Sequence, residues 1–352
     1  RWPTIGLSIM ATQASAITFL SMPGQAYEDG MRFVQFYFGL PLAMVFISVV
    51  IVPIYYRLRV FTAYEYLENR FDLKVRLFGA LLFLVGRGLA AGITIYAPAI
   101  ILSSVLGWSL GGTVLVIGVA VILYTVVGGT KAVSQTQKQQ MVVIMFGMVA
   151  AFGFAIAALP EGVSLHEATT VAGALGRMNV INLELDFSDR YNVWSGVLGG
   201  FFLSLSYFGT DQSQVQRYLS GRSVTESRLG LLFNGMLKIP MQFFILYIGV
   251  VVFAVFFFVR PPVFFNEPAI AAVHATAHSE EMTRVQSRWT TAWQTRKNHV
   301  QSFISARKSG DSAQIDGARV KLQSAQKDLD GVRSEARAVI AKATPQAELK
   351  DS

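Results

Sequence analysis

The chain has 352 residues, of which 53% are hydrophobic and only 15% are charged, and its mean hydropathy is +0.45. Soluble domains carry about 25% charged residues, so this composition excludes an ordinary soluble protein. The net charge of +8 comes without a basic stripe interleaved with aromatic residues, which argues against nucleic-acid binding. The absence of cysteine excludes disulfides, thiolate metal sites and cysteine nucleophiles.

Charge is unevenly distributed along the sequence. Almost half of the lysines and arginines follow Val259, in about a quarter of the length. We therefore expect two parts, a transmembrane core over residues 1–258 and a polar tail over residues 259–352. The sequence opens at Arg1 without an initiator methionine and stops in a polar stretch, which we interpret as truncation at both ends.

Seven apolar stretches are long enough to cross a hydrocarbon layer of about 30 Å, which takes about 20 residues of helix. They cover residues 5–22, 33–55, 78–106, 110–127, 141–159, 193–210 and 229–258. The third and seventh stretches are longer, which indicates tilt or projection beyond the bilayer. The sequence thus predicts an all-α protein of the cell membrane with several passes through the lipid bilayer.

Basic residues are concentrated in alternate loops. Those after spans 2, 4 and 6 are Arg57, Arg59, Arg70, Lys74, Arg76, Lys131, Lys138, Arg217, Arg222 and Arg228. The opposite short loops hold only Arg177 and Arg190, with Arg32 at a boundary. Since short basic loops stay in the cytoplasm, span 1 should run from inside to outside. Lys131 should then be cytoplasmic, and the tail around Lys321 extracytoplasmic.

The polar tail has a helix-forming composition and few large apolar residues. Residues 280–307 and 313–343 are predicted to form two helices, with Ser309-Gly310-Asp311 as the turn between them. We expect a two-helix hairpin outside the cell without a large core. A disordered, solvated insertion is the alternative.

Spans 1 and 6 carry more polar side chains than a simple anchor needs. Gln13 stands among hydroxyl residues in span 1, and span 6 runs into residues 209–212 (GTDQ). Small and hydroxyl residues can also serve only in helix packing. However, discontinuous helices at corresponding positions of two repeats mark a transporter's binding site, and spans 1 and 6 are five apart. We therefore expect span 1 to unwind around residues 11–15 and to bind a cation through exposed carbonyls.

Three ionisable residues lie at or near membrane depth. Arg87 is inside span 3, Lys238 is inside span 7, and Asp211 ends span 6. An intramembrane charge is by default a functional hypothesis, so we assign all three to the solute or ion pathway. The alternatives are an internal ion pair, or snorkelling to an interface, for which Arg87 and Lys238 would need a long reach.

Three long runs resemble motifs of the sodium/solute symporter family. They are residues 209–220 (GTDQSQVQRYLS), 124–133 (YTVVGGTKAV) and 62–71 (TAYEYLENRF). The resemblance covers residues 1–258 in the order expected of the family. The family fold is an inverted repeat of five plus five helices, usually preceded by an extra span. The resemblance implies that this chain holds core spans 1–7, without that extra span and without core spans 8–10, which carry sodium-binding hydroxyls.

Two further stretches are similar to the iodide, monocarboxylate and multivitamin branch of that family, residues 10–16 (MATQASA) and 96–99 (YAPA). The resemblance implies that Ala11 and Ala14 offer their backbone carbonyls to the main sodium site. It also implies that the side chain of Gln13 contacts the solute.

Other positions give a mixed signal. Thr18 of span 1 is also assigned to the solute. Lys238 resembles the span 7 lysine that touches the sugar in the sugar branch, and Tyr207 matches the aromatic gate beside it. The acidic sugar contact of span 2 falls near Tyr37, which weakens the case for a sugar. Gln137 replaces the acidic residue at the start of span 5 and is assigned, with Asp211, to the ion pathway.

An enzyme is not expected. His274 and His278 have the spacing of a zinc pair on one helix, but no glutamate lies between them, and a solvated helix face is the favoured interpretation. The resemblance implies sodium-coupled symport of a small solute by alternating access, with sodium as the co-transported ion. Two basic residues at depth favour an organic anion such as a monocarboxylate. The alternatives are a sugar-type sodium symporter, a symporter-like sensor domain of a histidine kinase, and a channel.

Overall fold

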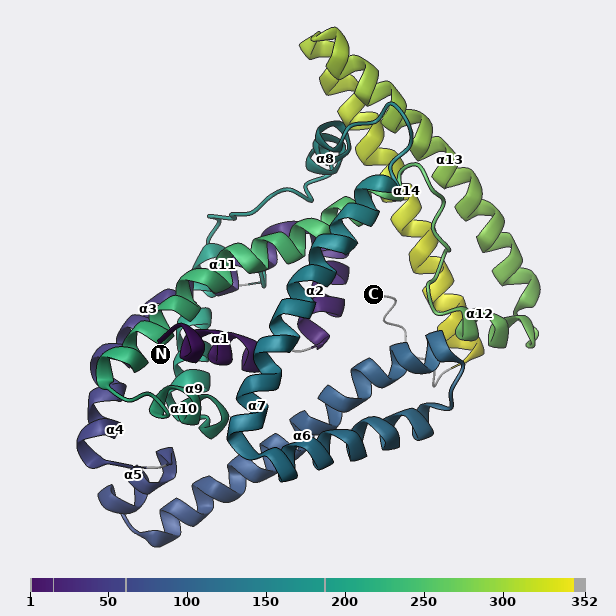
Figure 1. The fold of residues 1–352 in the computed structure, drawn as a ribbon. Helices are drawn as coiled ribbons and strands as arrows, with labels where there is room; N and C mark the ends of the chain where they lie inside the picture. The colour runs from purple at the N-terminus through teal and green to yellow at the C-terminus, as the bar shows by residue number, and fades with distance from the viewer. Residues whose placement is uncertain (1, 15, 61, 187, 345–352) are drawn as a thin grey trace. The chain divides into compact units, whose positions relative to one another are not determined.

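The computed structural model describes residues 2–14, 16–60, 62–186 and 188–344, and all regular elements in these ranges are helical (Figure 1). The first half contains α1 (Trp2–Gln13), α2 (Ala16–Asp29), a 3-10 helix η1 (Gly30–Tyr37), α3 (Gly39–Phe46), a π-helical turn η2 (Ile47–Ile51), α4 (Val52–Leu58), α5 (Ala63–Arg70), α6 (Leu73–Leu106) and α7 (Leu110–Ala157). The second half contains α8 (Leu165–Ala174), a π-helical turn η3 (Ser195–Gly199), α9 (Gly200–Thr210), α10 (Gln212–Leu219), α11 (Val224–Val255), α12 (Glu267–His274), α13 (Ser279–Ser309) and α14 (Ser312–Ala343).

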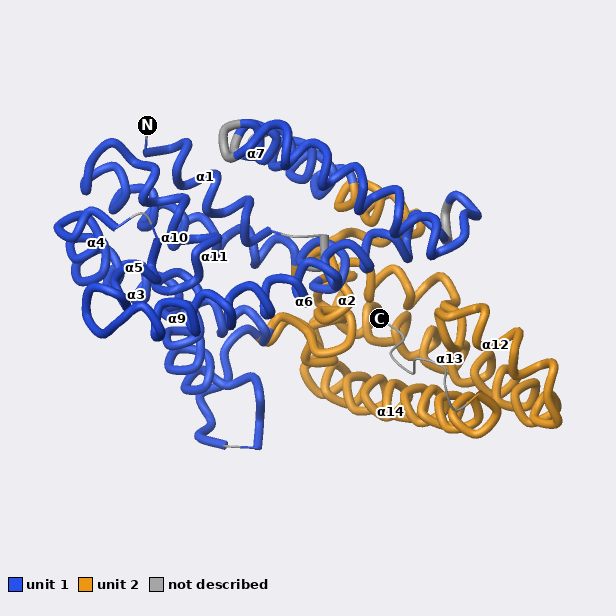
Figure 2. Tube along the Cα trace, turned by 90° about the horizontal axis from the view of Figure 1, so that it is seen from below, with its two compact units in different colours: residues 1–22, 32–150, 180–245 blue, residues 23–31, 151–179, 246–352 orange. Residues whose placement is uncertain are grey.

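The chain forms two compact units (Figure 2). Unit 1 comprises residues 1–22, 32–150 and 180–245, and unit 2 comprises residues 23–31, 151–179 and 246–352. This division does not follow the border at residue 258 that the sequence suggests. The predicted border separates membrane-spanning sequence from a polar tail, whereas the two units are compact parts of the fold. The border therefore stays a prediction.

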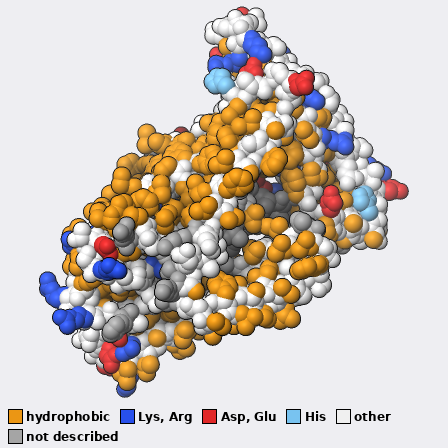
Figure 3. Space-filling view, viewed as in Figure 1, with side chains coloured by type: hydrophobic (Ala, Val, Ile, Leu, Met, Phe, Trp, Pro, Cys, Tyr) orange, Lys and Arg blue, Asp and Glu red, His pale blue; other side chains and the backbone are white. Residues whose placement is uncertain are grey.

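Five helical stretches in the described part of the chain are long and apolar enough to cross a bilayer. They are Thr18–Leu58, Leu73–Ser103, Leu110–Gly129, Gln135–Ala157 and Val224–Val255. The first combines the end of predicted span 1 with span 2, and the other four match spans 3, 4, 5 and 7. Span 6 is not among them. Figure 3 shows apolar side chains over the helices of unit 1, while charged side chains gather near α4 and α5 and on α13 and α14.

Local sequence explains where several helices begin and end. The carboxylate of Asp72 accepts a hydrogen bond from the Val75 amide at 2.9 Å and so starts α6, which Gly107 ends in the left-handed conformation. Helix α7 is broken at Gly129, whose φ of 56° and ψ of −161° only glycine adopts without strain. Predicted spans 4 and 5 are therefore two arms that meet at one residue.

The core of unit 1 joins the first helices to the later ones. Ile9 of α1, Met44 of α3, Phe208 of α9 and Leu231 of α11 belong to one buried apolar cluster. Gly39 lets α3 approach η3 and α9 so closely that a Cβ atom there would overlap their backbone, as small residues do in membrane helix pairs. This packing holds the broken helices described below in place.

Unit 2 contains the predicted hairpin. Helices α13 and α14 pack along each other, Gly310 provides the left-handed turn (φ 76°), and the carboxylate of Asp311 caps α14. The core of this hairpin is larger than the sequence analysis predicts. Val263, Phe264 and α12 pack with Trp289 and Trp293 of α13 and with apolar residues of α14. The hairpin is thus confirmed, and the expectation that it lacks a large core is wrong.

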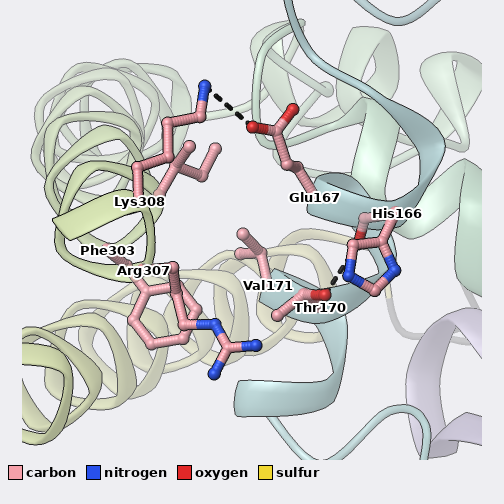
Figure 4. A pocket seen from close by; sticks show the side chains of 8 residues that line it. His166, Glu167, Thr170, Val171, Phe303, Arg307 and Lys308 are labelled. Carbon is pink, nitrogen blue, oxygen red and sulfur yellow. Dashed lines mark hydrogen bonds and ion pairs between the residues drawn. The ribbon is translucent and has the colours of Figure 1, made fainter. Parts of the chain in front are cut away.

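Helix α8 docks on α13 within unit 2 (Figure 4). The Glu167 carboxylate lies 2.8 Å from the Lys308 ammonium and also accepts a hydrogen bond from the Ser164 backbone amide, completing a capping box. The ammonium of Lys308 and the Ser164 bonds lower the pKa of Glu167 to about 2. Beside this pair, a cavity of about 190 Å³ is lined by Val171 and Phe303.

Candidate functional site

The helix of span 1 is interrupted where the sequence predicts it. Helix α1 ends at Gln13, Ala14 lies outside the helix, and α2 begins at Ala16; Ser15 lies outside the described residues. The last carbonyls of a helix lack partners within it and carry partial negative charge. One of them, on Met10, accepts a hydrogen bond from the Ala14 amide at 2.9 Å. Broken helices of this kind can offer carbonyl oxygens to a small hard cation, and the assignment of that role to Ala11 and Ala14 stays a prediction.

The side chain of Gln13 sits at this break with its Oε1 atom buried and without a hydrogen-bond partner in the described chain. A buried amide oxygen without a partner is costly, so a solute donor or a water is needed to satisfy it. Thr18 is half-buried on α2, and its side chain has no hydrogen bond to another described residue.

Gln137, assigned to the ion pathway, links α7 to α1. Its Oε1 atom accepts a hydrogen bond from the Ser8 hydroxyl at 3.0 Å, and its Nε2 atom donates to the Thr12 hydroxyl at 3.0 Å. The Thr12 hydroxyl in turn donates to the Ser8 carbonyl at 2.7 Å. This arrangement needs a side chain that both accepts and donates, so an amide fits and an ionised carboxylate would not.

Span 6 is also interrupted, at Asp211. Its extended backbone (φ −74°, ψ 116°) ends α9, and its carboxylate starts α10 by accepting hydrogen bonds from the Ser213 amide at 2.9 Å and hydroxyl at 2.6 Å. The other carboxylate oxygen forms an ion pair with the Arg87 guanidinium of α6. One acidic side chain therefore caps a helix and neutralises a cation from a distant span.

Tyr207 completes this cluster. The Arg87 guanidinium lies 5.6 Å from the centre of the Tyr207 ring, and the Tyr207 hydroxyl accepts a hydrogen bond from Gln214 Nε2 at 2.8 Å. The structure thus brings together Arg87, Asp211 and Tyr207, three residues that the sequence nominates separately. Because the charge of Arg87 is countered by Asp211, the alternative of an internal ion pair applies to both of them.

Lys238 is in a different situation. Its side chain on α11 is 0% exposed, and its ammonium has no hydrogen-bond or ion-pair partner among the described residues. Its Nζ atom lies 5.7 Å from the centre of the Tyr37 ring. A buried cation normally has a partner, and the described residues do not supply one to Lys238.

Two neighbours on α11 extend this buried polar face and are missed by the sequence reasoning. Asn234 and Gln242 stand one helical turn before and after Lys238 and are each 0% exposed. The Asn234 Oδ1 atom and both polar atoms of the Gln242 amide lack partners in the described chain. The available signal is the i, i+4, i+8 spacing of three polar residues in an apolar helix.

The histidine pair does not have the geometry of a zinc site. His274 ends α12, and His278 precedes α13, so the two are not on one helix as their spacing suggests. Among the described residues, no group of three or more histidine and acidic side chains could hold a metal ion.

Residues 1–286 match the sequence model of the sodium:solute symporter family. The chain belongs to the sodium:solute symporter family. This membership confirms the predicted family, and its relatives described below are named as transporters, not as enzymes. The matched residues end within α13.

Curated relatives of this family member include the human sodium/iodide cotransporter, 38% identical over 232 residues, or 65% of this chain and 35% of the relative. Human sodium-coupled monocarboxylate transporter 1 is 36% identical over 230 residues (65% and 37%). The sodium-dependent multivitamin transporter of Oryctolagus cuniculus is 35% identical over 219 residues (62% and 34%). This chain therefore spans little more than a third of the length of these relatives.

A solved structure of a Na+-coupled sialic acid symporter in a substrate-bound outward-open state has a similar fold. The TM-score is 0.64 at 22% identity, and the match covers 97% of this chain and 64% of that chain. This likeness confirms the predicted fold class, the all-α inverted-repeat transporter fold.

Proposed function

We propose that the protein is a sodium-coupled symporter that carries a small organic anion, such as a monocarboxylate, by alternating access. The observation that carries this proposal is Lys238, a fully buried cation without a protein partner. Family membership supports symport. Two of the relatives are named as transporters of iodide and of monocarboxylates, which supports an anionic solute.

An anionic solute would relieve the electrostatic cost of burying Lys238. Transferring an ammonium from water to the protein interior costs free energy unless an opposite charge compensates it. Two unit charges 4 Å apart attract by about 4 kcal/mol at an effective dielectric constant near 20. Asn234 and Gln242 could then serve as hydrogen-bonding neighbours of the same solute, since their amide atoms also lack partners.

The co-transported sodium ion would bind at the break of span 1. Ala11 and Ala14 would supply backbone carbonyls there, and the solute would meet Gln13 and Thr18 on the same interrupted span. If Gln13 faces the solute, Gln13→Ala should change solute affinity more than sodium affinity. If Gln13 only packs against a neighbouring helix, the variant should lose stability and keep its solute affinity.

Arg87 takes a lesser role in this proposal. Because Arg87 forms an ion pair with Asp211, it should attract an anionic solute less strongly than Lys238 does. We assign Arg87, Asp211 and Tyr207 to the mechanical coupling of α6 with the broken span 6, and Gln137 to the coupling of α7 with α1.

The test is binding of a panel of carboxylates, sugars and amino acids to the purified full-length protein and its variants. For an anionic solute, Lys238→Gln should weaken binding by more than about tenfold, or 1.4 kcal/mol. Lys238→Arg should restore binding only in part, because a guanidinium differs from an ammonium in shape and hydration. Arg87→Gln should act mainly on stability. Wild-type affinity in Lys238→Gln would refute the role of Lys238.

The same panel separates the sugar alternative. A neutral sugar would lose much less on Lys238→Gln, because glutamine keeps a hydrogen-bond donor. The position of Tyr37 beside Lys238, where the sugar branch would place an acidic contact, weighs against a sugar.

The orientation can be tested independently of the solute. Positive-inside counting places Arg222 in the cytoplasm and the tail around Lys321 outside. In this cysteine-free sequence, Lys321→Cys should react with an impermeant thiol reagent added outside the cell, and Arg222→Cys should not. Equal labelling of the two variants would contradict the proposed topology.

A further inference from the structure

Unit 2 contains a cavity of about 260 Å³ that the proposed transport cycle does not use. Four arginines line it: Arg177 after α8, Arg296 on α13, and Arg333 and Arg337 on α14. Three carboxylates also lie at its walls, so the lining has a formal charge of +1. A surplus of guanidinium groups around one cavity is typical of sites that bind carboxylates or phosphates.

Several hydrogen-bond donors in this cavity are unused. The Nε atoms of Arg177, Arg296 and Arg337 are all buried and have no partner among the described residues. No described carboxylate lies within ion-pair distance of the Arg177 guanidinium, and Asp330, Asp29 and Glu28 attract it only at longer range. Arg296 is 2% exposed and uses its two Nη atoms on the Phe256 carbonyl and on Gln326.

The carboxylates of the lining are already engaged. Glu28 accepts from Arg337 at 3.2 Å, Asp330 accepts from Gln326 Nε2 at 2.8 Å, and Asp29 accepts from Gln25 Nε2. None of them forms an ion pair with Arg177. The lining therefore keeps one more positive than negative charge, together with guanidinium N–H groups that have no hydrogen-bond partner, and this favours an anion over a cation.

Aromatic rings hold the guanidinium groups in position. Arg177 lies 4.8 Å from the ring centre of Phe253, and Arg333 lies 4.9 Å from that of Trp289. Such stacking fixes the guanidinium plane before a ligand arrives, which lowers the entropy cost of binding. The same rings offer apolar surface for the carbon atoms of an organic anion.

Burial also acts on the pKa values of two of these arginines. It lowers the pKa of Arg177, and it lowers that of Arg296 to about 10. Their desolvation is a cost of the folded state that a bound anion would offset.

We propose that this cavity binds a small monocarboxylate, whose carboxylate pairs with Arg177 and lies beside Arg296 and Arg337. The single surplus charge favours a monovalent anion over a phosphate, and the planar fork of the guanidinium with the aromatic walls favours a carboxylate over a halide. This site is independent of Lys238, and with the orientation proposed above it opens outside the cell.

The experiment uses the purified full-length protein and propionate as the probe, at a fixed chloride concentration. Trp289 lines the cavity, so its fluorescence should change saturably with propionate, and Trp289→Phe should remove that signal. Arg177→Gln should weaken this binding by about tenfold or more, since it removes a charged donor. Arg177→Lys should restore part of it. The matched control Arg307→Gln, an arginine on α13 at the separate α8 cavity, should leave it unchanged.

A second variant tests the proposal even if Arg177→Gln does not fold. Ser334 is exposed at the rim of the cavity, and Ser334→Glu would place a competing carboxylate there without disturbing the core. It should weaken propionate binding, whereas Lys238→Gln should not. The absence of saturable binding to the wild type, equal binding by Arg177→Gln, or loss only in Lys238→Gln would each overturn the proposal. The last outcome would point to the solute site of unit 1 instead.

Discussion

Lys238 of unit 1 and Arg296 of unit 2 are buried to nearly the same extent, 0% and 2% exposed, yet their surroundings differ. Arg296 donates to the Phe256 carbonyl at 2.7 Å and to Gln326 Oε1 at 2.9 Å, and it lies 5.2 Å from the ring centre of Phe257. Lys238 has no polar partner in the described chain. Burial alone therefore does not distinguish a structural role of a basic residue from a role in ligand binding.

The difference lies in how the donors are used. Arg296 belongs to a row on one face of α13, with Trp293 and Lys297, whose polar atoms donate to the carbonyls of Phe256 and Phe258 just after α11. A helix end needs such partners for its last carbonyls. We infer that Arg296 stabilises the fold through its two Nη atoms, which leaves only its Nε atom for an anion, and that Lys238 is kept for a ligand.

The largest effect is expected for Arg296→Met. It removes the charged donor of the Gln326 amide oxygen and of the Phe256 carbonyl, which then keeps only Trp293, so the free energy of unfolding should fall by about 3 kcal/mol. Thermal and urea unfolding of the full chain would measure this. Arg288→Met, which breaks only the exposed pair with Glu335 on the same hairpin, serves as the control and should cost less than about 1 kcal/mol. Equal losses in the two variants would remove the structural role of Arg296.

The opposite sign is expected for Lys238→Met. Removing an unpartnered buried charge and keeping most of the side-chain volume should leave stability unchanged or raise it by about 2 kcal/mol. Melting temperatures read beside solute binding would check this. A large loss of stability would show that Lys238 has a structural partner after all, and the contrast with Arg296 would fail.

Sequence patterns predict the parts of this molecule that depend on neighbours in the chain. The hairpin helices predicted over 280–307 and 313–343 are observed over Ser279–Ser309 and Ser312–Ala343, because Gly310 and Asp311 specify the turn and the cap locally. Helix α8 was missed although Ser164 and Glu167 carry a capping-box spacing.

Pairing between distant residues could not be predicted in the same way. Arg87 and Asp211 were each nominated from membrane depth, but they are 124 positions apart and nothing local indicates that they neutralise each other. The lack of a partner for Lys238 could not be predicted either, because it depends on which polar groups α3 and η1 place against α11. The sequence shows which charged residues lie at membrane depth. Whether each of them has an oppositely charged partner depends on how the helices pack.

A smaller effect is expected at the Arg87–Asp211 pair, which is intermediate between the two buried cations. Its side chains are 34% and 20% exposed, so solvent screens part of their attraction. A double-mutant cycle with Arg87→Gln and Asp211→Asn should give a coupling free energy of about 1 kcal/mol. Additive losses in thermal unfolding would show that the ion pair contributes nothing.

The smallest effect concerns Glu167 and Lys308 at the edge of unit 2. The pKa of Glu167 is lowered from 4.5 to about 2 by Lys308 and Ser164, so its contribution is complete above pH 4.5 and is lost as the pH falls towards 2. The difference in melting temperature between the wild type and Glu167→Gln should shrink over that interval. Lys308→Met should flatten this pH dependence. A difference that stays constant with pH would contradict the assignment.

The break at Gly129 determines where this protein tolerates added sequence. Because the two arms of α7 meet at one glycine, with no linker between them, a tag or reporter inserted there would shift the register of both arms. The turn at Gly310 joins two helix ends on an exposed tip, and an insertion there displaces nothing that is packed. Epitope tags and fluorescent reporters therefore belong at Gly310.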